Sequence, residues 1–66
     1  MDENVKDVLR GFQLDAEVFE KFAAHGIKFS QLITLSDADL LMLGVRDDEK
    51  RARMITEFAI YAGQQS

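Results

Sequence analysis

Few side chains in this 66-residue chain could carry out chemistry. It has a single histidine, His25, and no cysteine, which excludes disulfides and thiolate metal ligands. A serine or threonine nucleophile needs a general base and a group that orients the base, and one histidine cannot supply both. No set of carboxylates converges with His25 at metal-ligand spacing. We therefore expect no enzymatic activity, metal, cofactor or small-molecule substrate, and interpret His25 as a polar residue at a helix C-terminus.

The remaining chemistry is electrostatic, and the charges are distributed unevenly. The net charge is -4, with eight acidic and four basic residues in positions 1–45 and four of each in positions 46–66. Non-specific binding to nucleic acid requires a positive surface, and this balance opposes it.

One basic cluster follows position 45 and consists of Arg46, Lys50, Arg51 and Arg53. Three interpretations stay open: a solvated helix face, docking to an acidic protein surface, and binding to RNA. In the first, local ion pairs form at helical spacing, namely Asp47–Arg51, Asp48–Arg51 or Glu49–Arg53. The acids at positions 47–49 oppose the third, and no aromatic residue is interleaved to stack on bases.

The elements that position these charges are predicted to be helices, because apolar residues recur at i, i+3, i+4 and i+7. A first helix, a second helix, a single turn over 29–33, a short fourth helix from Ser36 to Gly44 and a long last helix are expected. The apolar stripes are Val5, Val8, Leu9 and Phe12 in the first helix, Val18, Phe19, Phe22 and Ala23 in the second, and Ala52, Ile55, Phe58, Ala59 and Ala62 in the last, flanked by Met54 and Tyr61.

Polar residues and glycines mark the expected helix ends. Asp15 is predicted to cap the second helix through its carboxylate, and Ser36 with Asp39 is predicted to form a capping box. Acids at 47–49 suit the first turn of a helix, where the dipole stabilises each by about 0.3–1 kcal/mol. Helix C-terminal ends are expected at Gly11, Gly26, Gly44 and Gly63.

The stretch SDADLLMLGV, residues 36–45, has more apolar residues than a short surface helix needs. Positions 40–43 are Leu, Leu, Met and Leu, which cover the whole circumference of a helix. Leu40 and Leu43 are three residues apart and share a face. Leu41 and Met42 are therefore covered either by another part of the chain or by a partner molecule.

The run VKDVLRGFQLDAEVFEKFAAHGIKFSQLITLSDADLLMLGV, residues 5–45, resembles the sterile alpha motif (SAM) family, and LITLSDADLLMLGV is its most specific part. The resemblance covers residues 4–62 and implies an all-α, compact five-helix bundle with a long C-terminal helix. Residues 1–3 and 63–66 are then flexible termini. The acids in RDDEKRARMI depart from many SAM domains, which have glycine and a basic residue at the start of this last helix.

SAM domains commonly associate head to tail, and the resemblance implies two surfaces for such contacts. The middle surface consists of Asp37, Asp39, Leu41 and Met42, with Glu17 and Glu20. The end surface consists of Arg46, Lys50, Arg51 and Arg53. We expect a protein-interaction module of a scaffold protein that binds copies of itself. The alternatives are binding to a different SAM domain, or binding of an RNA hairpin at the basic start of the last helix.

Two features of the sequence bear on the location of the protein. No apolar stretch approaches the roughly 20 residues of a membrane span, and the acidic N-terminus lacks the charge order of a signal peptide. We expect a cytoplasmic module without direct membrane contact. The DEK stretch that opens the last helix resembles germ-cell scaffolds that combine ankyrin repeats, a SAM domain and a leucine zipper. That subgroup implies germ granules, the piRNA pathway and the mitochondrial outer surface.

Overall fold

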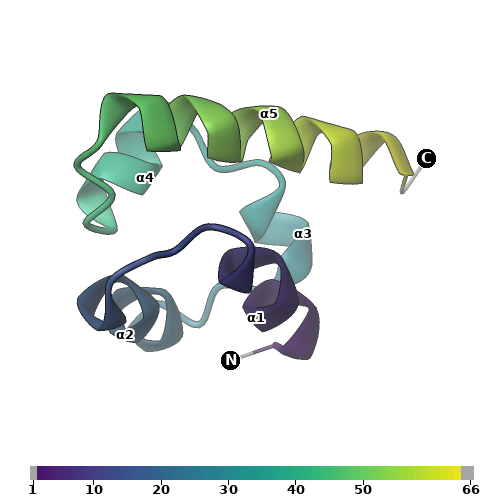
Figure 1. The fold of residues 1–66 in the computed structure, drawn as a ribbon. Coiled ribbons are helices and arrows are strands. Elements are labelled where there is room, and N and C mark those ends of the chain that lie inside the picture. Colours follow the sequence, from purple (N-terminus) through teal and green to yellow (C-terminus); the bar gives the residue numbers. More distant parts are fainter. Residues whose placement is uncertain (1, 65–66) are drawn as a thin grey trace.

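The computed structural model describes residues 2–64, and every regular element in that range is a helix. The helices are α1 (Glu3–Arg10), α2 (Ala16–Ala24), α3 (Phe29–Leu32), α4 (Asp37–Met42) and α5 (Asp48–Gln64). The prediction of an all-α fold with five helices and a long last helix is confirmed (Figure 1).

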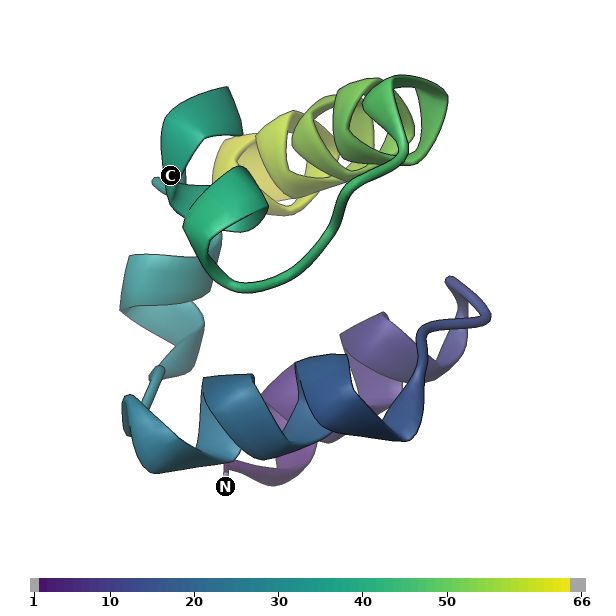
Figure 2. The same ribbon diagram turned by 90° about the vertical axis from the view of Figure 1, so that its left-hand side faces the viewer.

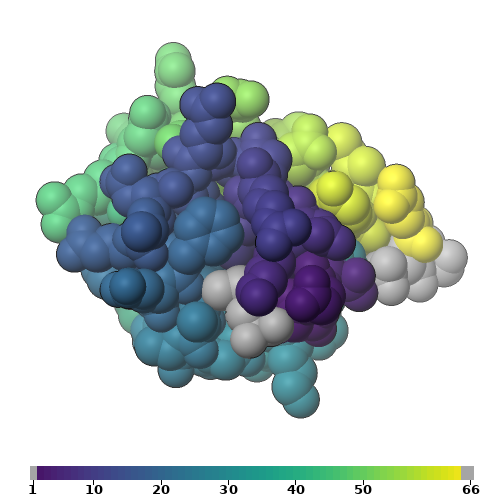
Figure 3. Space-filling model, turned by 60° about the horizontal axis from the view of Figure 1, so that its bottom comes forward, coloured from purple at the N-terminus to yellow at the C-terminus, as the bar shows by residue number. Residues whose placement is uncertain are grey.

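The helices form two layers joined at one edge. α1 and α2 lie side by side in one layer, α4 and α5 form the other, and α3 connects them (Figures 1 and 2). The last turns of α5 extend beyond the helices of the other layer, and in space-filling view this end of α5 projects at one side of the molecule (Figure 3). This arrangement leaves α4 at the margin of the fold, with one face against α5.

The core between the layers is built from residues of all five helices and of the connection before α5. Its buried apolar members are Val5, Val8, Leu9, Val18, Phe22, Leu32, Leu40, Leu43, Val45, Met54 and Phe58. Phe12 meets Phe58 edge to face at 6.3 Å between ring centres, and Phe29 meets Tyr61 in the same way at 6.0 Å. Such pairs stabilise beyond the area that they bury.

The predicted apolar stripes are only partly correct. In α1, Val5, Val8 and Leu9 are buried, whereas Phe12 follows the end of the helix and is partly buried. In α2, Val18 and Phe22 are buried, whereas Ala23 is exposed. In α5 the buried positions are Arg51, Met54 and Phe58, while Ala52 and Ala59 of the expected stripe are exposed. Alanine buries little area in either orientation, so the larger side chains determine which face packs inward.

Hydrogen bonds at the helix starts agree with the predicted caps in one case and differ in another. The Ser36 hydroxyl accepts from the Asp39 amide at 3.2 Å, and Asp39 Oδ2 accepts from the Ser36 amide at 3.1 Å, which confirms the capping box. Asp15 occupies the N-cap position of α2, but its carboxylate makes no capping bond, so that expectation is wrong. Asp47 caps α5, because its Oδ1 accepts from the amides of Glu49 and Lys50 at 2.9 and 3.2 Å.

Three of the four glycines mark the C-terminal ends of helices, as predicted. Gly11 is the C-cap of α1, and Gly26 and Gly44 follow α2 and α4 with φ of 59° and 97°. The prediction that Gly63 ends the last helix is wrong, because α5 continues to Gln64. Of the termini expected to be flexible, Glu3 opens α1 and residues 63–64 are helical, whereas residues 1, 65 and 66 lie outside the described residues.

Two structural features are absent from residues 2–64. None of the five helices has the length and apolar character that crossing a membrane requires. No group of three or more His, Cys, Asp or Glu side chains in this range is placed to hold a metal ion.

Candidate interaction surface

The four apolar residues of α4 and its end are divided between the core and the surface. Leu40 and Leu43 are 0% and 5% exposed, whereas Leu41 and Met42 are 51% and 73% exposed. Within residues 2–64, no other part of the chain therefore covers Leu41 and Met42. Two large apolar side chains remain in solvent, beside two aspartates of the same helix.

A groove opens beside Met42, which we call the Met42 groove. Its volume is about 230 Å³. Its lining residues come from α2's C-terminal end, the following connection, α3 and α4, namely His25, Ile27, Gln31, Thr34, Leu35, Asp39, Met42 and Leu43. The sequence pattern indicated the exposed pair but gave no sign of the groove, because its walls come from segments up to 18 positions apart in the chain. His25 is the C-cap of α2, as predicted, and lies at this groove.

The two aspartates of α4 are both exposed and both partly engaged within the chain. Asp39 uses Oδ2 in the capping box, and its other oxygen has no hydrogen-bond partner among the described residues. Asp37 accepts a bond from Arg51 Nε at 2.8 Å through Oδ1, with its side chain 61% exposed. The middle surface thus has an apolar centre beside two solvent-facing carboxylates.

Arg51 lies inside the fold, although the resemblance placed it on the end surface. It is 6% exposed, and its guanidinium donates to Asp37 in α4, to the Val45 carbonyl at 2.9 Å and to Asp48. The expected Asp48–Arg51 pair is confirmed. Neither the Asp47–Arg51 pair nor the Glu49–Arg53 pair forms among residues 2–64.

These contacts determine the electrostatics of Arg51. The side-chain hydrogen bond to Asp37 raises the pKa of Arg51, which burial opposes, and the attraction of both aspartates adds to the rise. A base whose pKa is higher in the folded than in the unfolded state stabilises the fold at any pH below the unfolded-state pKa. This contribution is lost only as the pH rises through the folded-state pKa. The guanidinium of Arg51 therefore remains positive at neutral pH and well above it, and it does not act as a pH switch.

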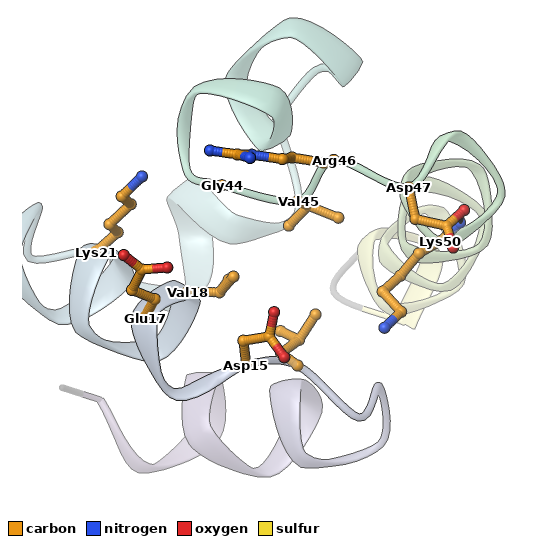
Figure 4. Close-up of a pocket in the computed structure, with 10 residues that line it drawn as sticks. Asp15, Glu17, Val18, Lys21, Gly44, Val45, Arg46, Asp47 and Lys50 are labelled. Atoms are coloured by element: carbon orange, nitrogen blue, oxygen red, sulfur yellow. Dashed lines mark hydrogen bonds between the residues drawn. The ribbon is translucent and has the colours of Figure 1, made fainter.

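Arg46 and Lys50 of the end surface lie around a second opening, which we call the charged hollow. It has a volume of about 330 Å³ and lies between α2 and the connection from α4 to α5 (Figure 4). Arg46 extends from this connection toward Glu17 and Lys21 of α2. Lys50 extends from α5, and its Nζ donates to the Gln13 carbonyl at 3.0 Å.

The charged hollow combines residues assigned to different surfaces. Glu17, assigned to the middle surface, lines it with Arg46 and Lys50 of the end surface. Its six charged residues are Asp15, Glu17, Lys21, Arg46, Asp47 and Lys50, which are three of each sign. A phosphate backbone therefore meets no net positive charge here.

Glu20 and Arg53 are the remaining residues of the middle and end surfaces, and Ile60 is an exposed residue that belongs to neither. Glu20 is exposed on α2, and Arg53 is exposed on α5, where it forms no ion pair within the described residues. Ile60, which the sequence pattern did not single out, is 51% exposed on the outer side of α5. Its position opposite Met54 and Phe58 on a helical wheel could have revealed it.

Comparison of the chain with family models, with curated proteins and with solved structures returned no match. The interpretation of the two surfaces therefore depends on the residues and contacts described above.

Proposed function

We propose that this chain is a SAM-type protein-interaction module that associates head to tail with copies of itself. The observation that supports this most directly is the exposed Leu41–Met42 pair on α4. An apolar centre with charged neighbours is the usual composition of a protein interface.

The charges around the pair favour a basic partner surface. Asp37 and Asp39 flank it, and the residues of the end surface that could meet them on a second copy are Arg46 and Arg53, which are exposed and form no ion pair among residues 2–64. Arg51 is not among the contacts we propose, because its guanidinium is bound within its own chain. Complementary charges would orient the two copies, and burial of Leu41 and Met42 would supply the stabilisation.

Contact between two different surfaces has a consequence for assembly. A head-to-tail pair keeps one unused surface of each kind, so the contact propagates into an open filament or closes into a ring. A scaffold protein carrying this module would thereby gather many copies of its other domains. Binding to a different SAM domain is the alternative that uses the same surface.

Sedimentation of the wild-type chain over a concentration series tests the proposal. We expect the average mass to rise above 7.5 kDa with concentration. Leu41→Glu should remain a folded monomer, because Leu41 is outside the core and a carboxylate there removes apolar area from the contact and would lose its hydration on association. Asn4→Glu, an equal charge change at an exposed site on α1, is the matched control and should associate like the wild type.

The outcomes separate the possibilities. A wild-type chain that stays monomeric at every concentration contradicts self-association. A Leu41→Glu variant that associates like the wild type, with its fold intact by circular dichroism, contradicts the role of α4.

A further inference from the structure

Three large apolar side chains are substantially exposed among residues 2–64, and they lie on two different elements. Leu41 and Met42 are on α4, where Met42 also lines the Met42 groove. Ile60 is on α5, with its side chain 51% exposed. Among the described residues, Ile60 is therefore the one large exposed apolar side chain outside α4 that a second copy could place against this groove.

The Met42 groove is suited to an inserted aliphatic side chain. Its apolar walls are Ile27, Leu35, Met42 and Leu43. Its volume of about 230 Å³ exceeds that of a single water, so an apolar group that entered would displace several solvent molecules from apolar surface. Asp39 also lines the groove and has one carboxylate oxygen without a partner among the described residues.

The charge distribution selects which element of a second copy fits. Contact of α4 with α4 would bring Asp37 and Asp39 of both copies together, and like charges oppose it. The side of α5 away from the core, which we call the outer face, instead presents Arg53 and Ile60, which are seven residues apart and about 10 Å from each other along the axis. Arg53 also lines an opening toward α1 with Asp7 and Glu57. Arg53 has no ion pair among the described residues to give up.

We propose that Ile60 of a second copy inserts into the Met42 groove, with Arg53 of that copy facing Asp39. This inference depends on the proposed self-association and names the part of the second copy that the groove receives. It places the outer face of α5, rather than the charged hollow, against α4. The groove and the outer face of α5 are different surfaces of the molecule, so each copy can bind one neighbour at each.

Sedimentation of Ile60→Lys tests the insertion directly. We expect a folded monomer at concentrations where the wild type associates, because the substitution replaces the inserted side chain with a charge and lies opposite the core. The matched control is Asn4→Lys, which adds the same charge at an exposed site on α1 and should associate like the wild type. Arg53→Glu should weaken association in the same direction, since it would oppose Asp39.

Mixing two variants identifies the contact surface. Isotope-labelled Ile60→Lys keeps its groove, and unlabelled Met42→Glu keeps its Ile60, so together they should form a heterodimer and no larger assembly. Amide shifts should then concentrate at Ile27, Thr34 and Leu35. Shifts at Leu14, Val18 and Arg46 instead would place the contact at the charged hollow and overturn the inference.

The two proposals fail in different ways. If the wild type never associates, both are wrong. If the wild type associates and Ile60→Lys associates equally well, the insertion of Ile60 is wrong while self-association through Leu41 stands.

Discussion

At the scale of single residues, Arg51 shows how burial changes the role of a charge. In the sequence it is one of four basic residues at the start of the last helix, and nothing distinguishes it from Arg46 or Arg53. In the fold its guanidinium joins α4, the connection and α5 through Asp37, Val45 and Asp48. A buried charge that keeps all its partners holds elements in register, whereas removal of one partner leaves a charge without compensation.

We predict that Arg51→Lys and Arg51→Met both lower the free energy of unfolding, measured by urea denaturation. Lysine keeps the charge but cannot form the fork that reaches Asp37 and Val45 together, and methionine keeps only the packing of the stem. Arg53→Met, at an exposed site two residues further along α5, is the control and should change the stability of the monomer little at concentrations below those of self-association. If the Arg51 variants are as stable as the control, the guanidinium contacts contribute nothing to the fold.

At the scale of elements, the helix ends depend on backbone conformation as much as on residue type. Gly44 and Gly63 look alike in sequence, since each follows an apolar helical run. Gly44 has φ of 97°, and a Cβ there would lie 3.4 Å from Lys21 Nζ. Gly63 lies inside α5, and a Cβ there would meet nothing within 4 Å.

Substitution of each glycine by alanine should therefore have opposite effects on thermal stability. Gly44→Ala is expected to destabilise by about 1–2 kcal/mol, because a side chain in the left-handed region is strained. Gly63→Ala is expected to stabilise by up to about 1 kcal/mol, since alanine favours the helix. Each kcal/mol corresponds to about 4–8 °C in Tm for a domain of this size. Equal shifts of the two melting temperatures would contradict the assigned backbone conformations.

At the scale of the whole molecule, apolar burial and charge act at different ranges in the proposed assembly. The net charge of -4 means that two copies repel at long range. Approach in the right orientation then depends on local pairing of Arg53 with the acids of α4. The exposed apolar residues act only after contact, because dispersion and burial require van der Waals distance.

At 0.1 M salt the repulsion between the net charges is already largely screened beyond about 10 Å, so adding more salt acts mainly on the close ion pairs and should weaken self-association without abolishing it. Exposed ion pairs contribute about 0–1 kcal/mol each and are screened, because the Debye length falls from about 10 Å at 0.1 M to about 3 Å at 1 M. Sedimentation at low and high NaCl measures the effect. Complete dissociation at high salt would show that charge, rather than burial of Leu41, Met42 and Ile60, holds the copies together.

The sequence by itself determined the elements, because local physics sets them: the apolar period predicted the helices, and the spacing of Ser36 and Asp39 predicted their capping box. Leu40 and Leu43, which their spacing places on one helical face, are both buried. Only the tertiary structure decided what depends on distant contacts. It placed Arg51 inside the fold, turned the larger side chains of α5 inward in place of Ala52 and Ala59, and left Leu41, Met42 and Ile60 in solvent. Helical periodicity places side chains around an axis, but packing against the other layer determines which of them remain exposed.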